Sequence, residues 1–315
     1  MKERIIITGI AGSLARLCAE ELHREGHEVI GVDYRTAPPG LPKEIVIHRA
    51  NYNKTRIVDV FRKHRPTMVL HLGRVGNLKE HPNKRFDLNV IGSAKLMDLS
   101  NELKVKRFVV LSTFHIYGAH PHNHIPIHEE EPLRAGQNFA QLADAVQLDN
   151  QANTWVYRHR NVRTVVLRPT NIVGPDIKNA IASYLRQSTV FHLLGFNPMW
   201  QFVHQTDMVR AIMLAAKGEE VGVFNVAGTG ELPIVDALEL TRLGGQRVVA
   251  VPSPLASAFL RLSRTFGQAF PTYLIDFFKY ACVISDERFR KAFGYAPQVD
   301  LVETVRSNQA AARAA

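Results

Sequence analysis

Two glycines near the start of the chain, Gly9 and Gly12, have the spacing of a loop that holds phosphate groups. Gly9 permits a tight turn, and Gly12 lets a pyrophosphate approach the backbone at the N-terminus of the following helix. Free N–H groups and the helix dipole favour an anion at that position. Asp33 follows about 20 residues later, where a carboxylate that binds ribose hydroxyls is expected. These three residues predict a dinucleotide-binding site.

A histidine-rich segment is the second candidate for chemistry. It holds five imidazoles before three consecutive glutamates: His115, His120, His122, His124 and His128. Imidazoles near carboxylates suit zinc or a similar ion. Alternatively, His115, which is close to Thr113, could transfer protons. A polar loop with solvated histidines is the simpler interpretation, so we adopt it and predict no metal site.

The elements that must position these residues follow from the apolar spacing. Ile5, Ile6 and Ile7 form a continuous β-branched run, which is typical of a strand buried on both faces. Apolar residues then recur at helical spacing up to Leu22, and Gly26 ends that helix. Further strands are expected at 27–32, 44–48, 68–73 and 107–113, with helices at 54–63 and 87–103. This alternation predicts an α/β fold with a doubly wound parallel sheet.

The composition is that of a globular protein. Of the 315 residues, 46% are hydrophobic and 22% are charged, which is enough for an ample core. The two cysteines indicate a reducing compartment rather than a disulfide framework. We see no signal peptide and no apolar run long enough to span a bilayer, so we expect a cytoplasmic location. The net charge is +10, but the basic residues are scattered and no nucleic-acid motif accompanies them.

A series of motifs supports a resemblance to a known family. In order along the chain they are Thr8-Gly-x-x-Gly, Asp33, His71-Leu72-Gly73, Asn89-Val-Ile-Gly92-Ser93, Leu111-Ser112-Thr113-x-x-x-Tyr117-Gly118, Leu167-Arg168-Pro169-Thr170-Asn171 and Phe202-Val203-His204-x-x-Asp207. This order resembles the extended short-chain dehydrogenase/reductases of the NAD-dependent epimerase/dehydratase family. The resemblance covers nearly the whole chain.

The resemblance implies a Rossmann sheet with a smaller, mixed C-terminal lobe. Residues 1–175 would form the dinucleotide-binding domain, and 205–228 would return to it. Residues 176–204 and 229–315 would form the lobe on the substrate side, with the apolar segment 255–278 in its core.

The resemblance also implies how the dinucleotide is held. NAD is expected rather than NADP, because Asp33 would face a 2′-phosphate, although Arg35 weakens this preference. Asn51 stands where the family usually has an Asp near the adenine. Arg74 replaces a small residue beside the pyrophosphate, where it would either clamp phosphate or block the site. The implied set of cofactor residues is Thr8, Gly9, Ala11, Gly12, Ser13, Leu14, Asp33, Asn51, Tyr52, Leu72, Gly73, Arg74, Asn89, Ser112, Pro169 and Asn171.

The catalytic pair of the resembled family is absent. That family combines a Ser or Thr with Tyr-x-x-x-Lys, in which the Tyr transfers a proton and the Lys binds the nicotinamide ribose and lowers the Tyr pKa. Thr113 fits the first position. One register places the pair at Phe139 and Ala143, and the other at Gln141 and Ala145. Tyr-x-x-x-Lys occurs nowhere in the chain.

Two functions remain open, and we favour the first. The first is a pseudoenzyme that binds a dinucleotide and acts as a sensor, scaffold or regulator, with a regulatory protein as a further partner. The second is an active oxidoreductase, epimerase or dehydratase for a nucleotide-sugar or hydroxy/keto substrate, in which Thr113 works with His115 or Tyr117. A third and weaker interpretation is a binding module that has lost the dinucleotide.

A homodimer is expected from the resemblance. The family commonly dimerises through a four-helix bundle, here built from the helices near 87–103 and 138–156. The apolar stripe offered for it consists of Leu142, Ala145, Val146 and Leu148.

Overall fold

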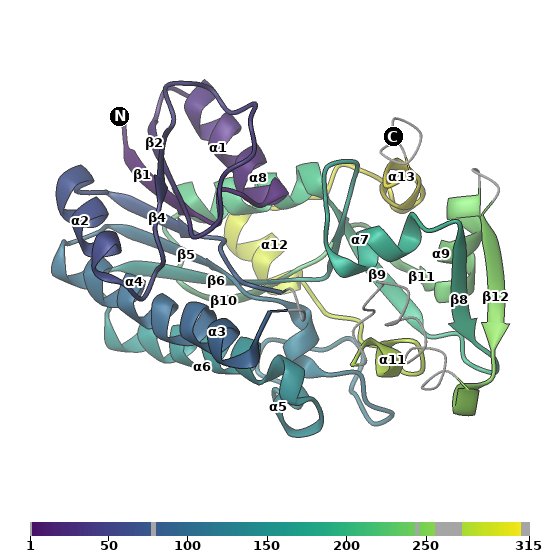
Figure 1. Ribbon diagram of the computed structural model, residues 1–315. Helices are drawn as coiled ribbons and strands as arrows, with labels where there is room; N and C mark the ends of the chain where they lie inside the picture. The colour runs from purple at the N-terminus through teal and green to yellow at the C-terminus, as the bar shows by residue number, and fades with distance from the viewer. Residues whose placement is uncertain (1, 77–79, 243–245, 256–272, 310–315) are drawn as a thin grey trace.

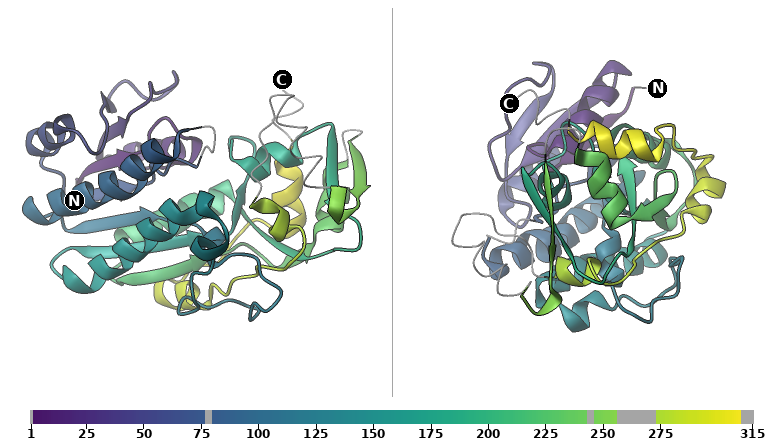
Figure 2. Two further views of the ribbon diagram at one scale, coloured as in Figure 1. Left: turned by 60° about the horizontal axis from the view of Figure 1, so that its bottom comes forward. Right: turned by 90° about the vertical axis from the view of Figure 1, so that its right-hand side faces the viewer.

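The computed structural model describes residues 2–76, 80–242, 246–255 and 273–309. A large α/β lobe and a smaller lobe lie side by side, and the smaller lobe sits at one end of the large sheet (Figures 1 and 2). Most of the apolar segment expected in the core of the smaller lobe, residues 256–272, lies outside the described residues.

The large lobe is built on a seven-stranded, entirely parallel sheet. Its strands, in spatial order, are β10 (Gly222–Val226), β6 (Arg163–Pro169), β5 (Arg107–Leu111), β4 (Met68–His71), β1 (Arg4–Thr8), β2 (Glu28–Asp33) and β3 (Val46–Arg49). From β1 the chain proceeds to β2 and β3 on one side, and from β4 it proceeds to β5 and β6 on the other side. The strand order therefore reverses between β1 and β4, and in such sheets ligands bind at the carboxyl ends of the strands at this point. The predicted doubly wound parallel sheet is confirmed.

Helices cover both faces of this sheet. One face is covered by α2 (Thr55–His64), α4 (Gly92–Glu102) and α6 (Ala143–Arg158), and the other by α1 (Ser13–Arg24), α8 (Gln205–Lys217) and α12 (Glu287–Phe293). Ile6 packs on the first face, whereas Ile5 and Ile7 pack on the second, and all three are fully buried. Burying each isoleucine side chain stabilises the fold by about 1.5–3 kcal/mol. The continuous isoleucine run is thus explained by a core on each side of β1.

Short helical segments connect these layers. They are α3 (Pro82–Phe86), the π-helical η1 (Asp87–Ile91), and the segments η2 (Phe114–Tyr117), α5 (Ala135–Asn138) and η3 (Ala140–Leu142). The single helix expected at 87–103 is therefore η1 followed directly by α4. No helix of the described residues is long and apolar enough to cross a membrane.

The smaller lobe is mixed, as expected. It contains a three-stranded sheet of β11 (Glu231–Pro233), β9 (Met199–His204) and β7 (Asn171–Val173), and a pair of β12 (Arg247–Val251) with β8 (Thr189–Leu193). Its helices are α7 (Ala180–Leu185), α9 (Ile234–Thr241), α11 (Leu274–Phe277) and α13 (Leu301–Ser307). An aromatic-rich core that includes Tyr184, Trp200 and Phe278 holds these elements together.

Of three elements near the expected domain boundaries, one follows the expectation and two depart from it. β10 pairs with β6 in the large sheet, and it lies within the segment that was expected to return there. In contrast, α12 packs Phe289 into the core of the large lobe, although its residues had been assigned to the smaller one. β7 pairs with β9 of the smaller lobe, although it precedes residue 175.

The apolar stripe that runs from η3 into α6 is mostly buried within the protomer. Leu142, Ala145 and Leu148 are each at most 2% exposed, and Leu148 packs against the large sheet. Only Val146 is half-buried. The stripe therefore belongs to the core of the protomer, and the sequence-based assignment of these residues to a dimer interface was wrong, because a periodic stripe looks the same whichever surface buries it.

Candidate functional site

The loop after β1 has the geometry of a phosphate turn. Gly9 has a φ of +80°, and a Cβ on it would lie 2.5 Å from the Cα of Gly73 in the loop after β4. Gly12 is the N-cap of α1, and its N–H donates to the carbonyl of Gly9 at 2.7 Å. In the described first turn of α1, which begins with Ser13 and Leu14, there is neither a side-chain cap nor an acidic residue. The positive end of the helix is therefore suited to an anion.

Asp33 ends β2 and is only 1% exposed. Its carboxylate accepts hydrogen bonds from the backbone N–H of Ala11 at 3.1 Å and from the backbone N–H of Arg35 at 2.9 Å. The Arg35 guanidinium adds two more, each at 3.1 Å. This contact with Asp33 is the main reason that the pKa of Arg35 is raised. A ribose would therefore compete with Arg35 for Asp33.

Tyr52 supports the phosphate turn from within the protein. Its hydroxyl accepts from the N–H of Gly9 at 3.0 Å, and the side chain is buried. Gly73 is needed for this contact, because a Cβ there would lie 2.4 Å from the Tyr52 hydroxyl. The neighbouring Asn51 is half-buried and its carbonyl accepts from Lys54 in a turn.

Three of the implied cofactor residues use their side chains within the protein. The Thr8 hydroxyl lies 2.7 Å from Nδ1 of His71, a buried histidine whose pKa is lowered to about 4 by burial. The Asn89 amide exchanges two hydrogen bonds with the backbone of Val75, at 2.7 and 3.0 Å, and so fixes the loop after β4 that contains the buried Leu72. Ser112 donates to Asp149 at 2.6 Å. These side chains position loops.

The charge of Arg74 interacts with groups from both lobes. Burial lowers its pKa, while Tyr273 and Asp144 raise it and Arg85 lowers it further. Asp144 already accepts from Arg85 at 2.7 Å and from Asn89 at 2.6 Å. The guanidinium groups of Arg74 and Arg85 thus share the single carboxylate of Asp144, so this part of the site has an excess of positive charge.

Thr113 and His115 form a hydrogen-bonded pair where β5 meets η2. The Thr113 hydroxyl lies 2.9 Å from Nδ1 of His115 and also accepts from the backbone N–H of His115 at 3.4 Å. Either group can be the donor in this contact, because the role of Nδ1 depends on which ring nitrogen carries the proton. Nε2 is buried and has no hydrogen-bond partner in the described protein. Burial, and to a lesser degree Arg74, lowers the pKa of His115 to about 3, so the ring is neutral at neutral pH.

The two registers for the lost Tyr and Lys differ in burial. Ala143 starts α6 and is exposed, whereas Ala145 is 1% exposed and faces the protein. Neither residue carries an ammonium group, so both registers lack the lysine. Phe139, in the register of Ala143, is half-buried.

Tyr273 brings a phenol to this region and was missed from the sequence. Its ring centroid lies 5.7 Å from that of His115 and 6.3 Å from that of Phe139. Burial raises its pKa, and the charge of Arg74 acts in the opposite direction. It comes from the turn before α11, so no local spacing in the sequence links it to Thr113.

Tyr117 has a structural role. Its hydroxyl donates to Asn225 at 2.8 Å and accepts from Arg168 at 2.8 Å. Arg168 is itself held by Asp149 at 2.6 Å, and burial raises the pKa of Tyr117. The phenolic proton is thus engaged inside the core, which removes Tyr117 from the alternatives for replacement acid–base chemistry.

Two other histidines of the histidine-rich segment, His120 and His122, contact each other. The ring centroids of His120 and His122 are 5.4 Å apart, and Nδ1 of His120 accepts from the backbone of His122 at 3.3 Å. Within the described residues, no group of three or more His, Cys, Asp or Glu side chains is arranged to hold a metal ion.

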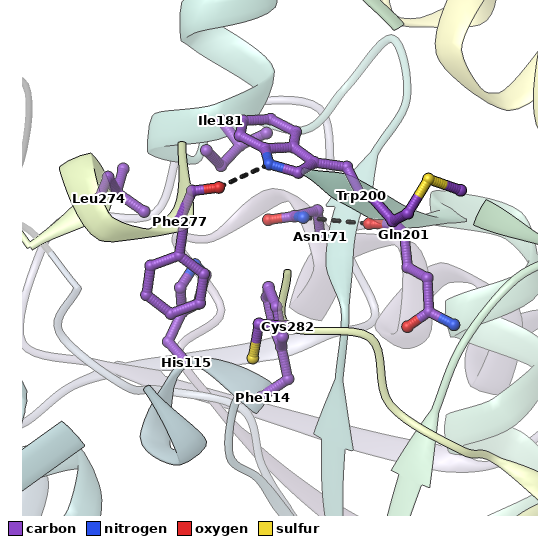
Figure 3. Close-up of a pocket in the computed structure, with 10 residues that line it drawn as sticks. Phe114, His115, Asn171, Ile181, Trp200, Gln201, Leu274, Phe277 and Cys282 are labelled. Carbon is purple, nitrogen blue, oxygen red and sulfur yellow. Dashed lines mark hydrogen bonds between the residues drawn. The ribbon is translucent and has the colours of Figure 1, made fainter. Parts of the chain in front are cut away.

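A cavity lies beside His115, between the two lobes (Figure 3). The space is small, with room for about one water molecule. Its described lining is Phe114, His115, Asn171, Ile181, Met199, Trp200, Gln201, Leu274, Phe277 and Cys282. Of the implied cofactor residues, Asn171 lines this cavity, and Pro169 ends β6 close by in the chain.

The fold and site define a dinucleotide-binding protein of the Rossmann class. Residues 5–227 match the NAD dependent epimerase/dehydratase family, and the chain belongs to that family. The resemblance stated from the sequence is thereby confirmed.

Two of the similar proteins have names that refer to nucleotide sugars. The chain is 26% identical over 212 residues to UDP-glucose 4-epimerase of Dictyostelium discoideum, covering 60% of each chain. It is 25% identical over 267 residues to UDP-glucuronic acid decarboxylase 4 of Arabidopsis thaliana, covering 76% of this chain and 56% of the relative. It also matches an uncharacterized protein of Mycobacterium tuberculosis at 26% identity, over 69% of this chain but only 57% of that protein's length.

Solved structures share the fold. UDP-glucose 4-epimerase of Thermus thermophilus, in complex with NAD, superimposes with a TM-score of 0.80 at 22% identity over 99% of both chains. The Bordetella bronchiseptica enzyme WbmG, in complex with NAD, has a TM-score of 0.78 at 19% identity, covering 100% of this chain and 94% of the enzyme. The description of the family and the NAD in both neighbours agree with the expected cofactor.

Proposed function

We propose that the protein binds NAD at the ends of β1, β2 and β4, and that it acts as a dinucleotide-linked sensor, scaffold or regulator. The proposal is supported by the phosphate turn at Gly9 and Gly12, by the uncapped first turn of α1 and by Asp33 at the end of β2. NADP is the less favoured cofactor, because a 2′-phosphate would meet the Asp33 carboxylate.

One observation carries the pseudoenzyme part of this proposal. The positions of the proton-transferring pair hold Phe139 and Ala143, or Gln141 and Ala145, and none of these has a phenol or an ammonium group. General acid–base catalysis contributes roughly 10²–10⁴-fold in rate, so its loss nearly silences the usual mechanism. A regulatory protein that reads the bound state is the corresponding partner.

Calorimetric titration with NAD, NADH, NADP and NADPH tests the binding part. Gly12→Asp places a carboxylate at the phosphate turn and is expected to abolish binding. Asn179→Asp is the matched control, because it adds a carboxylate at the N-cap of α7 in the smaller lobe. Failure of the unmodified protein to bind any of the four dinucleotides would refute the proposal.

Turnover tests the pseudoenzyme part. The protein saturated with NAD should leave UDP-glucose and UDP-glucuronate unchanged. Conversion at ordinary enzyme rates, about 1–10³ s⁻¹, would contradict it and would favour the second candidate.

The second candidate is an active enzyme with altered acid–base chemistry. It is supported by the Thr113–His115 hydrogen bond of 2.9 Å and by the phenol of Tyr273 nearby. Activity that is lost in both Thr113→Val and Tyr273→Phe, with NAD affinity unchanged, would establish it. His120→Phe, in the same histidine-rich segment, serves as the control.

A homodimer remains part of the proposal, with a changed interface. The large apolar side chains of Phe86 and Ile91, next to α4, are 45% and 48% exposed. They suit the face that a second copy would cover. Light scattering should give the mass of a dimer, and Ile91→Glu should give a monomer. We propose no nucleic-acid partner.

A further inference from the structure

Three basic segments that are far apart in the sequence meet at one edge of the large sheet. Each lies where a helix ends and the chain turns to the next strand: 62–65 after α2, 104–106 after α4 and 158–163 after α6. In a parallel sheet with helical crossovers, all such connections lie at the amino ends of the strands. The strands that follow, β4, β5 and β6, are neighbours, so the fold brings the three segments together.

Backbone hydrogen bonds join these segments side by side. The N–H of Arg163 donates to the carbonyl of Lys106 at 3.1 Å, and the N–H of Lys106 donates to the carbonyl of Thr67 at 2.9 Å. The Asn161 amide also donates to Asn101, near the end of α4, at 2.8 Å. Because the carboxyl end of β6 leads into β7 of the smaller lobe, the amino edge of the sheet faces away from that lobe (Figures 1 and 2).

The side chains at this edge are mostly basic. The three segments contain no Asp or Glu. Two acids that border them are engaged, since Glu102 lies 3.8 Å from Arg62 and Glu219 pairs with Arg163. Six cations of these segments are exposed and form no ion pair with the described residues, and we call them the basic edge: Lys63, Arg65, Lys104, Lys106, Arg158 and Arg160.

The helix ends at this edge account for only part of its charge. The C-termini of α2, α4 and α6 all reach it. Each helix C-terminus carries about half a negative charge, so the three together offset about 1.5 of the six positive charges. The surplus lies on an exposed face of a chain whose net charge is +10. Such a surface attracts an anionic partner.

The chemistry of the edge favours a lipid surface over a nucleic acid. α2, α4 and α6 end here rather than begin, so they present carbonyl groups and not the N–H groups with which helix N-termini contact single phosphates. Tyr157, next to Arg158, is 62% exposed, and Val221, just before β10, is 47% exposed. Tyrosine is enriched at membrane–water interfaces, where its ring meets the headgroups.

We propose that the basic edge docks the protein on the surface of an anionic lipid bilayer. Each Lys or Arg near such a surface raises the affinity about fivefold, and salt screens the attraction. The carboxyl ends of β1, β2 and β4 lie at the opposite edge of the sheet and stay open to solvent in this orientation. The inference therefore goes beyond the proposed function and does not depend on it.

Co-sedimentation of the whole protein with vesicles tests the inference. Vesicles of phosphatidylcholine with about one-third phosphatidylserine should bind the protein at low salt, whereas pure phosphatidylcholine should not, and high salt should release it. Lys106→Gln combined with Arg160→Gln should weaken binding about 25-fold. Lys178→Gln combined with Arg247→Gln is the matched control, because it removes the same two charge types from exposed positions of the smaller lobe. It should leave vesicle binding nearly unchanged.

Three results would overturn the inference: no binding to the anionic vesicles, equal binding to the neutral ones, or equal weakening by the two double variants. A labelled DNA duplex is titrated in parallel, and binding to the duplex without binding to vesicles would assign the edge to a nucleic acid instead. Circular dichroism shows that each variant is folded. Calorimetry with NAD on the same samples keeps the two proposals apart, because lost NAD binding with intact vesicle binding would refute the proposed function alone.

Discussion

Replacing Arg35 with alanine should increase the affinity for NAD. Arg35 and Asp33 are joined by two side-chain hydrogen bonds of 3.1 Å, and a ribose must compete with them. The Arg35 side chain is 51% exposed, so solvent screens the pair and its strength is that of a surface ion pair, about 0.2–1 kcal/mol. Since about 1.4 kcal/mol corresponds to a tenfold change in affinity, the expected gain reaches at most about fivefold.

The assay is calorimetric titration of the unmodified protein and of Arg35→Ala with NAD and NADP. Arg49→Ala is the matched control, because Arg49 is also an exposed cation beside β2 but donates to the carbonyl of Tyr34 and not to Asp33. This control removes the same charge without freeing the carboxylate. An unchanged or lower affinity for NAD in a folded Arg35→Ala protein would refute the reasoning that Arg35 occupies the ribose site.

Other predictions concern stability and the phosphate turn. Tyr52→Phe removes one of two acceptors of the Gly9 N–H, which keeps the Val32 carbonyl at 2.8 Å. It should lower the free energy of unfolding by at most about 1 kcal/mol and weaken NAD binding, as seen by urea titration and calorimetry. Asp149→Ala leaves the buried Arg168 unpaired and should cost about 3–5 kcal/mol in urea titration; a loss below about 1 kcal/mol would contradict the pairing. The pKa values of His71 and His115 are lowered to about 4 and about 3, so the unfolded chain binds protons first as the pH falls below about 6.5. Stability is therefore lost on acidification, by about 2 kcal/mol for each histidine between pH 7.5 and 5, and equal stability at both pH values would contradict their burial.

The sequence alone determined the framework of the protein. The isoleucine run, the two glycines and Asp33 specify β1, the phosphate turn, α1 and β2, because strand burial, left-handed turns and helix starts depend on residues close together in the chain. The absence of Tyr-x-x-x-Lys was also visible without a structure, since it is a property of spacing alone.

Tertiary structure decided which side chains are free for a ligand. The stripe of Leu142, Ala145 and Leu148 is periodic, but only packing showed that it faces the core. The Asp33 carboxylate was expected from its position in the sequence, but only the folded structure shows that Arg35 binds it. Both questions concern what lies opposite a side chain, and sequence periodicity does not contain that information.

The contacts that the sequence did not predict join residues that are far apart along the chain. Tyr273 lies next to His115 only because α11 folds back over η2, and Asn171 faces the same cavity from β7. Such contacts join residues that are far apart in the sequence, and their free energy comes from burial in a shared core rather than from local conformational preference. The sequence thus determined the dinucleotide fold, and the tertiary structure determined which distant side chains meet beside it.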